Sequence, residues 1–91
     1  MAQALWRRAH LDEFTLRQAR RSLAYARYWR EEASAPLTYI TPRRSLAEAR
    51  LALVDARRLR RQLVALRAHT TGYLTREQWA AIQANAAAAT A

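Results

Sequence analysis

The side chains that most clearly indicate a chemistry are arginines repeated along one predicted helix. At about 100° per residue, four arginines between residues 45 and 69 fall within an arc of roughly 100°. Two more arginines extend or flank this arc at its start. Guanidinium groups form paired hydrogen bonds with phosphates and carboxylates. The pattern predicts a polyanion-binding surface made of Arg43, Arg44, Arg50, Arg57, Arg58 and Arg61.

The charge of the whole chain has the same sign as this arc. Its 16 basic residues are all arginine, and 7 acidic residues leave a formal net charge of +9. Such an excess favours nucleic acid, an anionic membrane surface or an acidic protein as a partner. The use of arginine alone fits phosphate recognition, and it also fits a GC-rich genome, which would explain the many alanines. A solvated face is the alternative for the arc, but like charges three and four residues apart repel unless an anion meets them.

The mode of nucleic-acid binding follows from what the sequence lacks. Helix-turn-helix spacing and an RNA-recognition motif are both absent. We therefore expect contact with the DNA backbone without sequence specificity, and binding that weakens as salt is added.

Catalytic chemistry has little support in the sequence. The chain has no cysteine, and His10 lies near Asp12 and Glu13 without a second histidine or cysteine to complete a metal site. Glu31 and Glu32 are adjacent, so they point to different sides of a helix. Neither a glycine-rich phosphate loop nor a serine–histidine–aspartate order occurs. We expect a protein that is not an enzyme, with no catalytic residue, no metal site and no cofactor.

Aromatic residues form a second candidate surface on the first predicted helix. Phe14, Tyr25 and Trp29 fall on a different face from the stripe that contains Leu16 and Leu23. A helix with two apolar faces has two packing partners. We predict that Phe14, Tyr25 and Trp29 make a protein contact; packing inside the chain and stacking on nucleobases are the alternatives.

Three helices are predicted to position these residues, over 15–33, 45–69 and 75–88. Each begins at a possible capping box, in which a Thr or Ser is followed three residues later by Gln or Glu. Another short helix is predicted over 2–11, and the alanine-rich tail over 84–91 is expected to fray.

The connector over 34–44 contains Pro36 and Pro42, which stop helix propagation, and β-favouring residues between them predict a short extended stretch. The second helix has a seam at three- and four-residue spacing, with small residues at its start. The seam consists of Ala49, Ala52, Ala56, Leu59, Leu63 and Leu66. The fold class is therefore mainly α, with residues 1–91 in one small domain: an antiparallel helical hairpin, a short extended connector and a short third helix.

Two runs of residues resemble the gpW-like phage head-completion, or head–tail joining, proteins. The first is Phe14 to Ala19 with Leu23 after it, and the second is Tyr39 to Leu46, followed by Ala49, Leu51, Ala52 and Val54. The resemblance covers residues 14–66. It implies two helices with a small β-hairpin between them, assembled as a ring beneath the portal and around the DNA. This chain differs in having two connector prolines without a turn glycine, an N-terminal extension and a third helix.

Together these features predict a non-enzymatic structural protein of a phage or phage-like particle, of the head–tail connector type. Its expected partners are further copies of itself in a homo-oligomer or ring, a portal or other virion proteins, and the DNA backbone without sequence specificity. One alternative is a small basic accessory or regulatory protein that binds nucleic acid; another is an inhibitor or adaptor that binds an acidic protein surface. No stretch is apolar enough to span a membrane, and the expected location is the virion or a bacterial cytoplasm.

Overall fold

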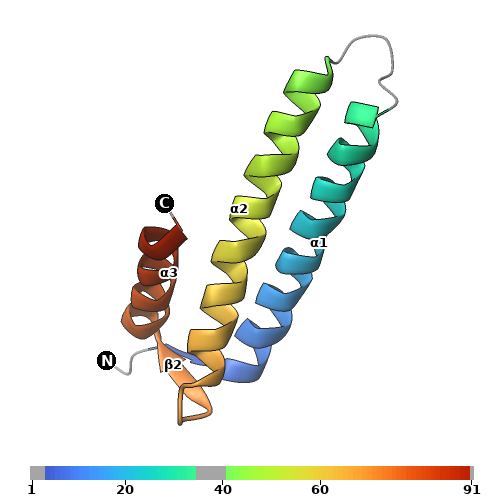
Figure 1. Cartoon of the computed structure of the whole chain (residues 1–91). Helices are drawn as coiled ribbons and strands as arrows, with labels where there is room; N and C mark the ends of the chain where they lie inside the picture. Colours follow the sequence, from blue (N-terminus) through green and yellow to red (C-terminus); the bar gives the residue numbers. More distant parts are fainter. Residues whose placement is uncertain (1–3, 35–40, 91) are drawn as a thin grey trace.

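The computed structural model describes residues 4–34 and 41–90, which form an antiparallel helical hairpin with a third helix beside it (Figure 1). The mainly α fold class predicted from the sequence is confirmed. In chain order the elements are β1 (Leu5–Arg7), α1 (Arg8–Ser34), α2 (Pro42–Arg67), β2 (Tyr73–Thr75) and α3 (Arg76–Thr90).

Helix α1 is 27 residues long and begins seven residues before the predicted start at Thr15. Thr15 is not a cap: it lies inside the helix and is buried, and its hydroxyl has no hydrogen-bond partner among the described residues. The preceding turn is helical because its side chains already have tertiary partners. Leu11 packs on the core cluster, and Asp12 pairs with Arg67 of α2.

Helix α2 begins at Pro42, not at the predicted Ser45, and it ends at Arg67, not at His69. The N-cap is Thr41, whose side-chain oxygen accepts a hydrogen bond from the Arg44 amide at 3.2 Å. Proline suits the first helical position because its missing N–H has no intrahelical acceptor there. Ser45 is buried within the helix, which makes the second predicted capping box wrong.

Small side chains line the contact between α1 and α2. The buried residues of α1 include Thr15, Ser22 and Ala26, and those of α2 include Ser45, Ala49 and Ala56. These spacings of four and seven residues keep one stripe of each helix turned to the other. The small-residue start of the predicted α2 seam thus lies in the hairpin interface, where short side chains let two backbones approach closely.

A two-stranded antiparallel sheet ties the N-terminal segment to the link between α2 and α3. Its register pairs Leu5 with Thr75, Trp6 with Leu74, and Arg7 with Tyr73. The predicted helix over 2–11 is therefore wrong: residues 5–7 form β1, and α1 begins at once after it. Next to the sheet, one guanidinium nitrogen of Arg8 donates to the carbonyl oxygens of Arg67 and His69. These carbonyl groups lie at the C-terminal end of α2 and just after it, where no further helical turn supplies a donor.

Helix α3 begins as predicted, immediately after a Thr75 capping box. The Thr75 hydroxyl accepts from the Gln78 amide at 3.2 Å, and the Gln78 side chain accepts from the Thr75 amide at 2.8 Å. Trp79 packs with Leu66 and Leu74 in the core cluster that joins α2, β2 and α3. Helix α3 continues to Thr90, two residues beyond the predicted end at residue 88, and includes most of the tail that was predicted to fray.

The region between α1 and α2 was predicted to be a connector over 34–44 with an extended stretch. Ser34 belongs to α1, and α2 begins at Pro42. The β-favouring residues at 37–40 lie outside the described residues, and so does the place where a family-type β-hairpin would lie.

The molecule is elongated, with principal extents of 56 × 24 × 22 Å. Its radius of gyration is 16.5 Å, whereas a compact domain of this length has about 12 Å. Its accessible surface is 7075 Å², compared with about 5,400 Å² for a typical monomer of this mass. The chain alone therefore buries less surface than a compact protein does.

Candidate polyanion-binding face

Four arginines lie on the side of α2 that faces away from α1, and we call them the outer face. All four are exposed. Their spacing of seven, seven and four residues keeps them on one side of the helix and separates the first from the last by about 27 Å. The outer face consists of Arg43, Arg50, Arg57 and Arg61.

Most of the outer face carries uncompensated charge. Helix α2 holds eight arginines and two acidic residues, so it contributes +6 to the net charge. Two ion pairs occur within the part of the chain that the structure describes, and they use Arg58 and Arg67. Arg43, Arg50 and Arg57 are therefore free to meet an external anion.

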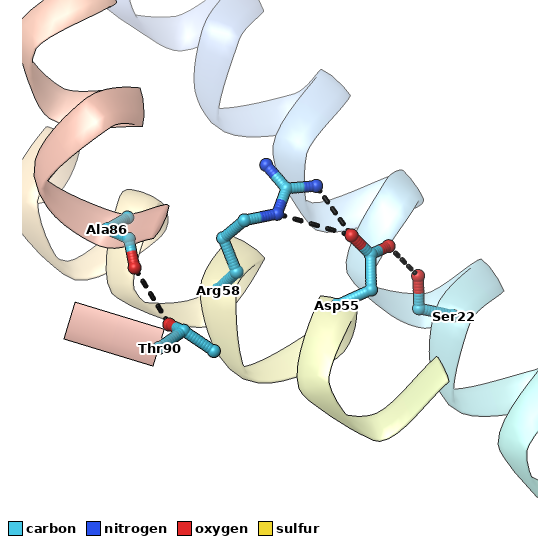
Figure 2. Close-up of polar contacts among 5 residues, drawn as sticks. All are labelled: Ser22, Asp55, Arg58, Ala86 and Thr90. Carbon is cyan, nitrogen blue, oxygen red and sulfur yellow. Dashed lines mark hydrogen bonds and ion pairs between the residues drawn. The ribbon is translucent and has the colours of Figure 1, made fainter. Parts of the chain in front are cut away.

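Arg58 turns away from the other arginines of the predicted arc. Its guanidinium donates to Asp55 at 2.6 Å, and the other oxygen of Asp55 accepts from the Ser22 hydroxyl of α1 at 2.7 Å (Figure 2). The hydrogen bonds from Arg58 and Ser22 hold the pKa of the Asp55 carboxyl below its usual range, against the opposing effect of desolvation. Arg58 thus links α2 to α1 through Asp55 and has less freedom to bind a partner.

Arg61 has an intramolecular contact as well as an exposed position. One guanidinium nitrogen donates to the carbonyl oxygen of Ala89 at 2.9 Å, at the C-terminal end of α3. The Thr90 hydroxyl donates to the Ala86 carbonyl at 2.7 Å in the same turn (Figure 2). These contacts explain why the alanine-rich end of α3 stays helical, since carbonyl groups at a helix end otherwise lack partners.

Arg44 and Arg60 are exposed on two different sides of α2, flanking the outer face. The structure therefore places the six arginines of the predicted surface in three settings. Four form the outer face, Arg44 flanks it, and Arg58 is paired with Asp55.

The predicted protein-contact residues lie on α1, away from the outer face. Phe14 and Tyr25 are 49% and 56% exposed, and Trp29 is partly buried with its ring 5.1 Å from that of Tyr28. Two shallow hollows follow this stripe, and Arg21 lines both of them. We call Phe14, Tyr25, Tyr28 and Arg21 the aromatic face. Arg21 was not among the contact residues predicted from the sequence, although it lies one helical turn before Tyr25.

The residues that would be needed for catalysis or metal binding are dispersed. His10 is exposed, His69 is partly buried, and Asp12 is engaged with Arg67, which lowers the pKa of its carboxyl. Glu31 is exposed and Glu32 buried. Within residues 4–34 and 41–90, no group of three or more His, Asp or Glu is placed to hold a metal ion.

Comparisons with protein-family models, with curated proteins and with solved structures find no match for this chain. In addition, no helix in the described ranges is long and apolar enough to cross a membrane. The arrangement of charge and apolar surface is therefore what indicates a function for this chain.

Proposed function

We propose that this chain is a non-enzymatic structural protein of a phage-like particle, of the head–tail connector type, which binds the DNA backbone through the outer face of α2. The observation that carries the proposal is the row of exposed arginines on that face, none of which has an ion-pair partner among the described residues. The resemblance of residues 14–66 to head-completion proteins supports the placement in a particle.

The spacing of the row suits a regular polyanion. A row of about 27 Å spans roughly eight base pairs of duplex DNA, which carries one negative charge per 1.7 Å. Arg50 and Arg57 lie about 10 Å apart, so each guanidinium meets a different phosphate. Exposed Ala47 and Val54 lie between the arginines of this row. Neither of these reads a base edge by hydrogen bonding, so binding is independent of sequence.

The aromatic face supports assembly with further copies or with a portal. Half-exposed Phe14 and Tyr25 lie on α1, whereas the outer face lies on the far side of α2. A neighbouring subunit that covers the aromatic face therefore leaves the outer face open. In a ring joined through the aromatic faces, α2 is free to face the DNA.

The salt dependence of DNA binding tests this proposal. Fluorescence anisotropy with a labelled duplex of arbitrary sequence is measured from about 50 to 200 mM NaCl. If four phosphates are neutralised, the slope of log K against log salt is about −3.6. Changing Arg50→Gln together with Arg57→Gln should reduce the slope to about −1.8.

A matched control removes the same charge from another face. Arg20 and Arg27 are exposed on α1, so Arg20→Gln with Arg27→Gln should leave the slope near that of the unchanged protein. An equal reduction by both pairs would mean that the duplex responds to net charge alone. No binding at the lowest salt concentration would also refute the proposal.

A further inference from the structure

The two edges of the helical hairpin are defined by two contacts between α1 and α2. On one edge Arg67 donates to Asp12 at 2.8 Å, and on the other Ser22 donates to Asp55 at 2.7 Å. These contacts also fix the register of the antiparallel pair. The residue numbers of side chains that lie opposite each other add up to between 77 and 79.

The edge marked by Arg67 and Asp12 continues as a row of leucines and arginines. Residues seven apart stay on nearly the same side of a helix, with a drift of only about 20°. On α2 the row continues from Arg67 through Arg60 and Leu53 to Leu46, and on α1 it continues from Asp12 through Leu16 and Leu23 to Arg30. Without Arg67 and Asp12, six residues of this row remain, and we call them the leucine edge: Leu16, Leu23, Arg30, Leu46, Leu53 and Arg60.

The register arranges the leucine edge as three successive pairs. Leu16 lies nearly level with Arg60, Leu23 with Leu53, and Arg30 with Leu46, since the residue numbers of each pair add up to 76, one less than those of Ser22 and Asp55. Successive pairs are about 10 Å apart along the helices. The centre is therefore apolar, and an arginine lies at each end, one on each helix.

The apolar part of this edge is open to solvent. Leu23 is 42% exposed and Leu46 is 44% exposed, while Leu16 and Leu53 are partly buried. Helix α3 does not cover them, because it packs on α2 around Leu66 in the core cluster. The molecule also exposes about 1,600 Å² more than a compact monomer of its mass, which is ample for an interface of ordinary size at about 800 Å² per partner.

The charges of the leucine edge decide which occupant fits. Arg30 and Arg60 are exposed and make no ion pair among the described residues. If two copies pair through this edge about a two-fold axis, each of these guanidinium groups faces a leucine of the other copy. Arg20 and Arg27 add further positive charge beside it on α1. A partner helix with an apolar stripe and acidic flanks supplies both the leucine contacts and the missing carboxylates.

We propose that the leucine edge docks an amphipathic helix of another protein, whose apolar stripe covers Leu23 and Leu53 and whose acidic residues pair with Arg30 and Arg60. The two arginines are about 20 Å apart along the hairpin and lie on different helices. The partner helix therefore carries carboxylates about four turns apart, on opposite flanks of its stripe. This surface is separate from the outer face that the proposed function uses.

The test uses two synthetic three-heptad peptides with the same leucine stripe. One has glutamate on both flanks of the stripe and the other has lysine, and each is labelled for fluorescence anisotropy. The full-length protein should bind the glutamate peptide and not the lysine peptide. Changing Leu23→Ser together with Leu53→Ser should weaken binding by about tenfold or more, since these leucines form the centre of the contact. The matched control, Leu51→Ser with Val54→Ser, alters exposed apolar residues on other sides of α2 and should leave binding unchanged.

A charge reversal keeps the test informative even if the serine variant folds poorly. Arg30→Glu with Arg60→Glu changes only exposed side chains and should transfer the preference from the glutamate peptide to the lysine peptide. An unchanged preference would mean that the peptide binds elsewhere. Sedimentation showing a dimer that the leucine variant abolishes would assign the edge to a second copy and overturn the proposal.

The result of the peptide-binding test does not depend on whether the outer face binds DNA. Loss of peptide binding with an unchanged salt slope for DNA locates the two partners on separate faces. Conversely, the variant Arg50→Gln with Arg57→Gln should reduce the salt dependence of DNA binding and retain peptide binding. That result would also show that DNA and the peptide bind to different faces.

Discussion

Enlarging one small side chain at the hairpin interface should destabilise the protein. Ala56 is buried on α2, next to Asp55, whose carboxylate accepts a hydrogen bond from Ser22 of α1 at 2.7 Å. Short side chains on both helices allow the backbones of α1 and α2 to lie close together here. Changing Ala56→Leu adds three carbon atoms where little space is available, so the helices must separate or the leucine must adopt a strained rotamer.

The expected loss follows from that overpacking. Extra methylene groups in a well-packed interior lower the free energy of unfolding by about 1–3 kcal/mol. For a domain of this size, each kcal/mol lowers Tm by about 4–8 °C, so a loss of 2 kcal/mol corresponds to roughly 8–16 °C. Alanine and leucine both favour helices, which leaves packing as the main difference between them.

Urea and thermal unfolding, followed by circular dichroism, measure this effect. Ala47 is exposed on α2, so Ala47→Leu makes the same chemical change without crowding α1 and should leave the unfolding free energy within about 0.5 kcal/mol. If Ala56→Leu unfolds at the same urea concentration as Ala47→Leu, the close approach of α1 and α2 at Asp55 and Ser22 is wrong.

Two further predictions concern acid sensitivity and helix caps. The pKa of Asp55 is lowered in the folded chain, so its charge stabilises the fold above the unfolded pKa of about 3.9, and this contribution disappears as pH falls below that value. Urea titrations should show Asp55→Asn to be less stable than the unchanged protein at pH 7, by about 1 kcal/mol or less, with the two converging near pH 2; a constant difference would contradict this assignment. In the same assay, Thr41→Ala should lose about 1 kcal/mol, whereas Ser45→Ala should lose little because its buried hydroxyl has no partner among the described residues. A larger loss of stability for Ser45→Ala than for Thr41→Ala would mean that Ser45, and not Thr41, caps α2.

The sequence predicted the helical architecture because helix periodicity is a local signal. The α2 seam through Ala49, Ala56 and Leu63 recurs in the hairpin interface, and the Thr75 capping box has both predicted hydrogen bonds. The Thr15 box failed because tertiary contacts of the preceding turn extend α1 beyond it. A threonine before a proline, as at Thr41, is itself a helix-start signal, and the prediction from the Ser45 box did not use it.

The two-stranded sheet lay beyond the reach of sequence patterns. Each strand has three residues, which is too short for a detectable alternation, and its partner is about 70 residues away in the chain. Helical spacing did predict which arginines of α2 share a side. It did not predict that Arg58 turns to Asp55 or that Arg61 reaches Ala89, because both contacts depend on how α1 and α3 pack.

The hydrogen bonds of Arg8 and Arg61 mean that the identity of the cation matters to the architecture itself. Arg8 reaches the carbonyls that follow the last turn of α2, and Arg61 reaches one at the end of α3. A chain recoded with lysine would have the same electric field at long range, yet an ammonium group on a flexible stem is a poor substitute for a planar guanidinium at such a terminus. Replacing arginine by lysine would therefore alter internal hydrogen bonds at these two positions, whereas at Arg50 and Arg57 it would alter only contacts with a partner.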